Sequence, residues 1–145
     1  MPEEPLNLGL LLFIPYRALE SAVLAELAGH GHRLTLSQAR VFQRIDPDGS
    51  RPGDLAEAAQ LSKQTLGSIL DQLERAGYVA RVPDPSDGRA RLVRLTEAGR
   101  ELVELSLPVV RATEAAWAAH LGPARTRALR EALTELRSLT DPFLE

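Results

Sequence analysis

The most constraining feature of this chain is a helix-forming segment that leads directly into a basic hairpin, between residues 61 and 96. Ser62 is placed to accept a hydrogen bond from a free backbone N–H at the start of the helix, and Gly77 to adopt the left-handed conformation beyond its last turn. The apolar residues between them recur at helical spacing and predict one buried stripe, made of Leu66, Ile69, Leu70 and Leu73. The opposite face is polar. A helix of about four turns with a polar face fits the major groove of DNA.

Two short β-prone runs, residues 78–82 and 89–95, follow this helix and predict a hairpin whose loop contains proline and glycine. Arg89 lies at the predicted tip, where a guanidinium group can reach a narrow minor groove. Asp87, two residues earlier, could orient Arg89 by a charge-assisted hydrogen bond. A basic hairpin can also be a solvated sheet edge that its charges protect. The DNA-binding interpretation therefore depends on the hairpin following the capped helix directly.

Further short motifs surround these two elements. They are LTLSQAR at 34–40, DLAE at 54–57, LSKQT at 61–65, LERAGYV at 73–79, DPSDGRA at 84–90 and LTEAG at 95–99. Their order and spacing resemble the multiple-antibiotic-resistance regulator (MarR) family of winged helix-turn-helix repressors, over about half of the chain. The chain departs from the family pattern at Gly67 and Ser68, where a bulky or basic residue is common, and at Ser86, where an extra arginine is common.

These departures affect what the resemblance implies. The base preferences of relatives do not transfer to this chain, and weaker binding of DNA by the hairpin is expected. Gly67 costs about 1 kcal/mol against alanine inside a helix, which suggests the close approach of another surface.

The polar helix face and the hairpin tip supply the candidate DNA contacts. A lysine and unpaired backbone N–H groups at a helix N-terminus suit a phosphate or a base edge. The predicted DNA-binding residues are Ser37, Arg40, Ser62, Lys63, Gln64, Thr65, Ser68, Asp87, Arg89 and Arg91. The expected partner is double-stranded DNA with a pseudo-palindromic operator.

The charge of the chain is unevenly distributed. The formal net charge of −3 argues against a general nucleic-acid coat protein. Residues 34–95, however, carry nine Lys or Arg against eight Asp or Glu, and residues 81–94 carry four arginines against two aspartates. The acidic excess lies in the flanking segments, so we expect the molecule to meet DNA with one side only.

Composition argues against several other classes of protein. The chain has no cysteine, which excludes disulfides, thiol redox sensing and cysteine-ligated metals. No cofactor is expected, and a loop before a helix explains the pair His30 and His32 as well as a metal site does. The acidic start and the short apolar run Leu10–Ile14 argue against a signal sequence or a membrane span, and for a cytoplasmic location.

The segments on either side of the motifs are predicted to be helical. Residues 6–27 are apolar on more than one face and cannot all point into one small core. Thr96 begins a long helix, and after Gly122 and Pro123 a last helix repeats leucines at helical spacing. The expected fold is mainly α with a small β-hairpin wing. Its predicted parts are an N-terminal dimerisation helix (1–33), a winged helix-turn-helix DNA-binding lobe (34–95) and C-terminal dimerisation helices (96–145).

A homodimer follows from these apolar segments. A winged lobe of about 60 residues would be only marginally stable alone, and terminal helices from two chains could interlock to support it. Two recognition helices related by a twofold axis meet successive major grooves about 34–36 Å apart, and so select a roughly palindromic site. The alternative is a monomeric helical bundle with a winged insert.

The resemblance also implies a small effector, often aromatic or anionic, that binds between the DNA-binding lobe and the dimer helices. The candidate effector-binding residues are Tyr16, Arg17, His32 and Trp117. Core packing explains Tyr16 and Trp117 equally well. A ligand that binds one spacing of the two winged lobes better than another would shift the dimer toward or away from the operator-compatible geometry.

The sequence thus predicts a homodimeric, sequence-specific DNA-binding transcriptional regulator, and more narrowly a repressor relieved by a small effector. The alternative is a winged-helix protein-interaction module without DNA binding, which the acidic total and the small residues Gly67 and Ser68 favour. Catalytic residues are not predicted, because no motif for an enzyme is found.

Overall fold

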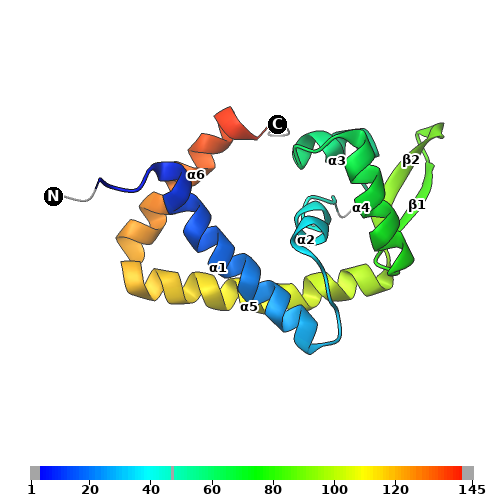
Figure 1. Ribbon diagram of the computed structural model, residues 1–145. Helices are drawn as coiled ribbons and strands as arrows, with labels where there is room; N and C mark the ends of the chain where they lie inside the picture. The colour runs from blue at the N-terminus through cyan, green and yellow to red at the C-terminus, as the bar shows by residue number, and fades with distance from the viewer. Residues whose placement is uncertain (1–3, 47, 142–145) are drawn as a thin grey trace.

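The computed structural model describes residues 4–46 and 48–141, and in these ranges it contains six helices and one two-stranded antiparallel hairpin (Figure 1). In chain order the elements are α1 (Leu8–Gly29), α2 (Leu36–Phe42), α3 (Pro52–Ala58), α4 (Lys63–Arg75), β1 (Val79–Asp84), β2 (Asp87–Leu95), α5 (Glu97–Leu121) and α6 (Pro123–Thr140). The predicted fold class, mainly α with a hairpin wing, is confirmed.

Helices α2, α3 and α4 pack with the hairpin around one apolar core. The predicted stripe of α4 is buried, and none of its four residues is more than 6% exposed. It meets Val41 from α2, Leu55 from α3, and Val79 and Val93 from the two strands. Burying each such side chain contributes about 1.5–3 kcal/mol. Because these apolar residues occupy one side of α4, its polar residues must face outward.

The ends of α4 form as the sequence predicts. The Ser62 Oγ accepts a hydrogen bond from the backbone N–H of Thr65 at 3.1 Å. At the other end Gly77 has a φ of 86°, and the next residue, Tyr78, donates its N–H to the carbonyl of Leu73 at 3.0 Å. The glycine therefore turns the chain from the helix straight into β1.

The hairpin is longer at its tip than predicted, because β1 continues through Pro83 to Asp84. The register pairs Val79 with Leu95, and it becomes irregular between Pro83 and Asp84. Ser50 adds an isolated antiparallel bridge to Val93, with both backbone hydrogen bonds formed. The loop before α3 thus lies against the outer edge of β2.

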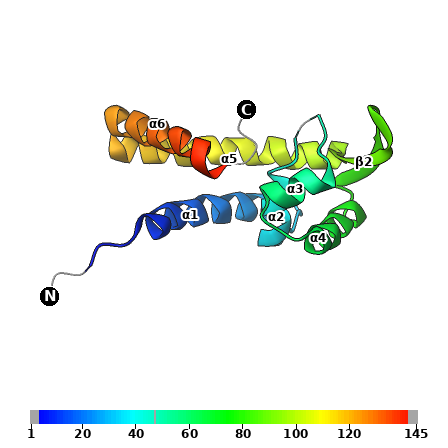
Figure 2. The same ribbon diagram turned by 90° about the horizontal axis from the view of Figure 1, so that it is seen from above.

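Helix α5 follows the hairpin almost without a linker. The Thr96 Oγ1 accepts a hydrogen bond from the backbone N–H of Gly99 at 3.1 Å, which confirms the predicted cap. The helix runs for 25 residues, and Pro108 lies inside it. Seen from above, α5 extends along the molecule, with the hairpin at one end and α6 folded back beside the other (Figure 2).

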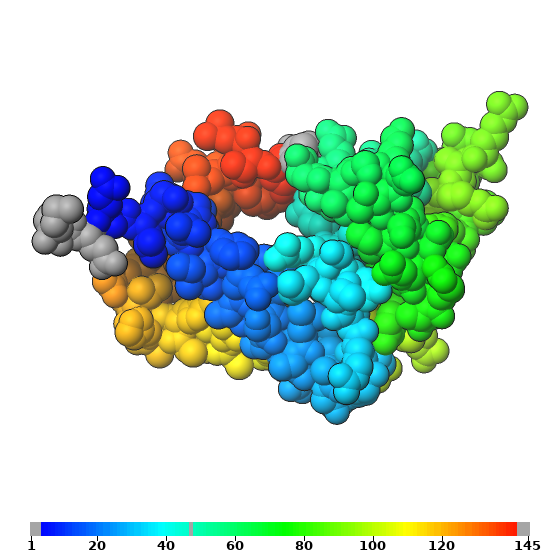
Figure 3. Space-filling model, viewed as in Figure 1, coloured from blue at the N-terminus to red at the C-terminus, as the bar shows by residue number. Residues whose placement is uncertain are grey.

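The C-terminal end of α6 approaches the α2–α3 loop. The Asp141 Oδ1 lies 3.4 Å from Nη2 of Arg44, and its Oδ2 lies 2.9 Å from Nη2 of Arg137. In the space-filling view the first half of α1 and α6 form one end of the molecule, and α2–α4 with the hairpin form the other (Figure 3).

Helix α1 is long and apolar enough to cross a membrane by length and composition alone. The apolar run Leu10–Ile14 is too short to span a membrane, but the helix that contains it has 22 residues. Length therefore does not exclude a membrane span. Core helices of globular proteins pass the same test, and the second half of α1 packs against α5, with Leu27 4% exposed and Glu20 8% exposed.

Two glycines in the helices give a matched pair of stability tests. A Cβ added at Gly99 would collide with the backbone carbonyl oxygen of Tyr78, whereas one added at Gly67 would meet no atom within 4 Å. The surface that Gly67 was expected to approach is therefore not found among the described residues of this chain.

We expect Gly99→Ala to lower the free energy of unfolding by about 1–3 kcal/mol through overpacking. Gly67→Ala, in contrast, should raise the free energy of unfolding by about 1 kcal/mol through helix propensity. Urea denaturation followed by circular dichroism measures both. A Gly99→Ala protein as stable as the unaltered chain would contradict the packing described for the start of α5.

Candidate nucleic-acid interface

The first two turns of α4 present polar side chains to solvent. Lys63, Gln64 and Ser68 are exposed, and none of them has a side-chain hydrogen bond or ion pair with another residue in the described parts of the chain. Thr65 is also exposed, and its Oγ1 accepts a hydrogen bond from the Ser62 hydroxyl at 2.9 Å. This end of the helix combines exposed N–H groups with a lysine, which suits a phosphate or a base edge.

The tip of the hairpin is built around one buried carboxylate. Asp84, 6% exposed, accepts hydrogen bonds from the backbone N–H and the hydroxyl of Ser86, at 2.9 and 2.8 Å. Arg51, immediately before α3, donates to the same carboxylate through Nε and Nη2, at 3.1 and 2.9 Å. The Ser86 donors first, and then Arg51, hold the pKa of Asp84 below its ordinary value although burial opposes this. The tip is therefore fixed by a charged carboxylate at neutral pH.

Asp87 has a different role from the predicted one. Its Oδ1 accepts from the backbone N–H of Arg89 at 3.1 Å, so it shapes the turn rather than orienting the guanidinium group. The side chains of Arg89 and Arg91 are exposed and have no ion pair within residues 4–46 and 48–141. Both guanidinium groups are therefore available to a partner.

Arg81 joins the hairpin to α4. Its Nη1 lies 2.7 Å from the Asp71 Oδ1, and its Nη2 donates to the carbonyl oxygen of Gly67 at 3.2 Å. Its backbone N–H donates to Glu74 at 3.1 Å. The recognition helix and the wing are thereby held as one unit. In the sequence Arg81 is only one of four arginines in the hairpin segment. Opposite charges on the two sides of the Gly77 turn are the signal that could have predicted this contact.

The two candidate DNA contacts on α2 differ in their surroundings. Ser37 is exposed in the first turn of the helix. Arg40 is also exposed, but its Nε and Nη2 donate to both carboxylate oxygens of Glu20 on α1, at 2.9 and 3.2 Å. A role of Arg40 in DNA binding stays a prediction. In the structure Arg40 connects α2 to α1.

Glu20 is the centre of a polar contact between α1 and α2. The hydrogen bond from Arg40 lowers the pKa of Glu20 most strongly, burial opposes it, and Tyr16 and Arg17 lower it further. Beside it, Gln43 donates to the Tyr16 hydroxyl at 3.0 Å. These side chains connect the helix that precedes the winged lobe to the first helix within it.

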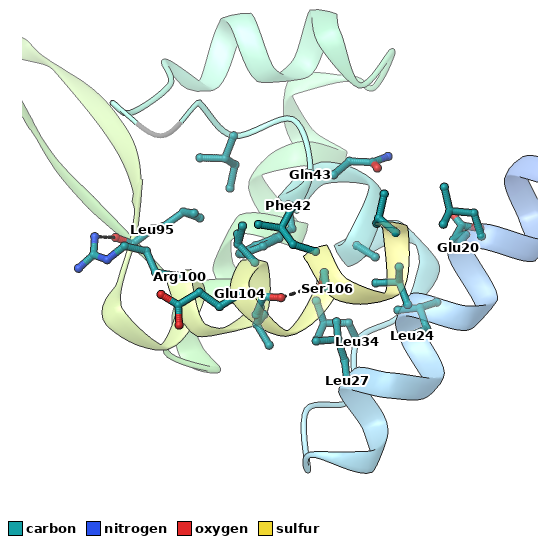
Figure 4. Close-up of a pocket in the computed structure, with 18 of the residues that line it drawn as sticks. Glu20, Leu24, Leu27, Leu34, Phe42, Gln43, Leu95, Arg100, Glu104 and Ser106 are labelled. Carbon is teal, nitrogen blue, oxygen red and sulfur yellow. Dashed lines mark hydrogen bonds between the residues drawn. The ribbon is translucent and has the colours of Figure 1, made fainter. Parts of the chain in front are cut away.

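A cavity of about 640 Å³ lies between α1, α2 and α5 (Figure 4). Of the four predicted effector-binding residues, Tyr16 lines it, and Arg17, His32 and Trp117 are not among its lining residues. Arg17 lies 3.8 Å from Glu20, His32 Nδ1 lies 2.9 Å from the Tyr78 hydroxyl, and Trp117 is half-buried on α5. The predicted residues are aromatic or polar, whereas most of the lining is aliphatic.

The histidine pair has partners other than a metal. His30 Nε2 lies 3.2 Å from a carboxylate oxygen of Glu26, and His32 contacts Tyr78. Within the described ranges, no three His, Asp or Glu side chains are grouped so that they could hold a metal ion. These contacts agree with the interpretation of the pair as part of a loop before a helix.

Comparisons with known proteins place this arrangement in a family. A sequence model of the MarR family matches residues 34–90. The HTH-type transcriptional repressor Rv2887 of Mycobacterium tuberculosis is 33% identical over 132 residues, which cover 90% of this chain and 94% of that protein. The chain belongs to the MarR family. It is therefore a transcriptional regulator with a winged helix-turn-helix fold.

Two other similar proteins match different shares of this chain. The transcriptional activatory protein BadR of Rhodopseudomonas palustris is 44% identical over 66 residues, which are 45% of this chain but only 38% of BadR. CouR from Rhodococcus jostii RHA1, in a crystal structure with p-coumaroyl-CoA bound, matches with a TM-score of 0.71 at 26% identity. That match covers 96% of each chain, so the flanking helices share the family arrangement along with the winged lobe.

The Glu20–Arg40 contact predicts a pH-dependent contribution to stability. The pKa of Glu20 is lowered in the folded protein, so the contact stabilises the fold above the ordinary glutamate pKa of about 4.3. That contribution is lost as the pH falls through the folded-state value. At pH 7 we expect Glu20→Gln to lower the free energy of unfolding by about 1–2 kcal/mol, because Arg40 is half-exposed.

The measurement is urea denaturation at several pH values, with Glu101→Gln as the control, since Glu101 is exposed and makes no ion pair with the described residues. The difference between Glu20→Gln and the unaltered protein should shrink below pH 4 and the control should show no such trend. A difference that stays constant down to pH 3 would argue against a charged Glu20 in the folded protein.

Proposed function

We propose that this MarR-family regulator is a homodimer that represses transcription by binding a pseudo-palindromic operator, and that a small molecule relieves the repression. The observation that carries the proposal is the combination of exposed polar residues at the start of α4 with exposed arginines on the wing. Arg81 holds these two surfaces together, and Asp84 fixes the wing tip. A rigid two-part surface of this kind suits adjacent grooves of one duplex. The similar protein Rv2887 is named a transcriptional repressor, which supports repression rather than activation.

The predicted dimer is supported by apolar side chains that one copy leaves uncovered. On α1, every residue from Leu8 to Ile14 is exposed, although six of the seven are apolar. Helix α6 contains no buried residue, and its leucines at positions 129, 133, 136 and 139 are between 38% and 83% exposed. Contiguous exposed apolar surface marks an interaction site. A second copy would cover it and place two recognition helices about 34–36 Å apart.

The division into functional parts follows this proposal. Residues 1–33 and 96–145 would supply the dimerisation helices, and residues 34–95 would bind DNA. Binding to chromosomal DNA in turn supports a cytoplasmic location.

The proposed effector would bind in the cavity between α1, α2 and α5. This cavity is enclosed partly by the helices of the dimerisation lobe and partly by the winged lobe, so a ligand there contacts both. A ligand that fits one relative position of the lobes better than another changes the fraction of dimers competent for DNA. CouR, a structural neighbour, has p-coumaroyl-CoA bound in its crystal structure.

Selection of bound duplexes from a random pool, followed by gel shift at low salt, tests the DNA-binding proposal. We expect an enriched sequence with two related halves whose centres lie about 10–10.5 base pairs apart. Absence of any retarded duplex at micromolar protein would favour the protein-interaction module instead.

Removal of the wing-tip charge should weaken binding to the selected operator. We expect Arg89→Ala to raise the dissociation constant about tenfold, which corresponds to about 1.4 kcal/mol. The slope of log affinity against log salt should fall by about 0.9 for each wing that contacts DNA, because fewer counterions are released. Fluorescence anisotropy at several salt concentrations measures both quantities.

Arg111→Ala is the matched control, because Arg111 is exposed on α5, outside the winged lobe. It should leave affinity and slope unchanged. Equal behaviour of the two variants would remove the wing tip from the proposed interface.

Removal of apolar side chains from α6 should dissociate the dimer. The double variant Leu129→Gln and Leu133→Gln changes the exposed apolar stripe, and we expect it to raise the dimer dissociation constant by at least about 100-fold, given about 1.5–3 kcal/mol for each buried leucine. Sedimentation equilibrium measures the change. Glu131→Gln with Glu135→Gln, on the opposite face of the same helix, is the control and should remain dimeric. A leucine variant as dimeric as this control would exclude α6 from the interface.

A further inference from the structure

The cavity between α1, α2 and α5 is lined mainly by apolar side chains. Most of its lining is aliphatic, and it includes Leu24 and Leu27 from α1, beside Phe42 from α2 (Figure 4). Helix α5 adds Leu102 and Val103. A volume of about 640 Å³ is that of a site for a small organic molecule. The walls therefore favour apolar surface on whatever occupies the cavity.

The charged residues at the cavity do not favour an anionic ligand. Its lining contains one arginine, Arg100, and two glutamates, Glu20 and Glu104. Arg100 lies at the end opposite Glu20 and donates from Nη1 to the carbonyl oxygen of Leu95 at 3.3 Å (Figure 4). The nearby guanidinium group of Arg40 is engaged by both oxygens of Glu20. Glu20 and Arg40 therefore neutralise each other, and the remaining charges of the lining, Arg100 and Glu104, sum to zero. A ligand carboxylate would meet no net positive charge and no unpaired cation among the described residues beside Glu20.

Among the described residues, most polar side chains that line the cavity are already hydrogen-bonded, and Glu104 is the exception. The Ser106 hydroxyl donates to the carbonyl oxygen of Leu102 at 2.7 Å, and Gln43 donates to the Tyr16 hydroxyl. Across residues 4–46 and 48–141, every buried side-chain nitrogen and oxygen atom has a hydrogen-bond partner. An anionic group beside Glu20 would lose its water without gaining a free donor, because the Arg40 donors there are already engaged.

We propose that this cavity selects an uncharged, largely apolar ligand and discriminates against carboxylates and other anions. Glu20 is the specificity-determining residue, because it pairs with Arg40 and so leaves that guanidinium group unavailable to an anion. The ligand preference of the cavity does not depend on the proposed function, but any effect of the ligand on DNA binding rests on it. It narrows the expected aromatic or anionic effector to an uncharged one.

Two dyes with the same ring skeleton test the charge preference. N-phenyl-1-naphthylamine is uncharged, and 8-anilino-1-naphthalenesulfonate is its sulfonated counterpart. Fluorescence titration of the full chain should give a dissociation constant at least about tenfold lower for the uncharged dye, a difference of about 1.4 kcal/mol. Equal or tighter cavity binding of the sulfonated dye would overturn the proposal, and so would the failure of both dyes to bind.

Substitutions that fill the cavity test whether the dyes bind there. Val103→Phe and Val110→Phe each add bulk at a lining position, and we expect each to weaken the uncharged dye at least about fivefold. Ala112→Phe adds a similar side chain at an exposed position of α5 that does not line the cavity, and it should leave dye binding unchanged. Circular dichroism confirms that each variant is folded. Undiminished binding in both folded valine variants would overturn the assignment.

Glu20→Gln tests the proposed origin of the selectivity. Removing its charge releases the Arg40 guanidinium group, so affinity for the sulfonated dye should rise at least about fivefold while affinity for the uncharged dye changes less than twofold, because only the anion gains a cation partner. Glu101→Gln is the charge-matched control on α5 and should change neither. Unchanged affinity for the sulfonated dye in Glu20→Gln would overturn the role of Glu20.

Failure of this inference and failure of the proposed function give different results. If the uncharged dye binds the cavity but leaves operator affinity unchanged, the ligand class stands and the effector-response proposal fails. If an anion binds the cavity more tightly than its uncharged counterpart and releases DNA, the regulatory proposal stands and the ligand class is overturned.

Discussion

The arrangement of the winged lobe depends on burial of one face of α4. Four apolar residues at helical spacing cover the core formed by α2, α3 and the hairpin, and this fixes the rotation of the helix about its axis. Lys63, Gln64 and Ser68 face solvent as a consequence, since no other rotation would bury the stripe. The polar surface of the recognition helix is thus set by hydrophobic packing on its opposite side.

Polar contacts then determine how neighbouring elements are placed relative to α4. Arg81 attaches β1 to the outer side of the helix, and Arg51 attaches the wing tip to the start of α3 through Asp84. The Arg40–Glu20 contact connects the same lobe to α1. Each contact pairs an arginine that is partly exposed with a carboxylate, so each positions an element more than it contributes to overall stability.

Much of the winged lobe could be predicted from the sequence, because its signals are local. The Ser62 cap, the Gly77 stop and the apolar stripe depend on residues a few positions apart. The pairing of Arg40 with Glu20 could not be predicted, since it depends on how α1 lies across α2 in three dimensions. The same limit applied to the cavity, where only Tyr16 of the four predicted effector-binding residues lies in the lining. Periodicity identifies buried faces but not the spaces between helices.

The direct continuation of β2 into α5 has a mechanical consequence. A helix of 25 residues is about 37 Å long and stiff. Its start is fixed to the turn between α4 and β1, because the Thr96 hydroxyl donates a hydrogen bond to the Gly77 carbonyl oxygen. A tilt of about 5° at its distal end would therefore displace the wing by about 3 Å. Pro108 interrupts the backbone hydrogen bonds of α5 near its midpoint, so this is where the helix bends most easily. The preceding residue, Leu107, lines the cavity. Small adjustments among the terminal helices are thus amplified into a larger displacement of the hairpin.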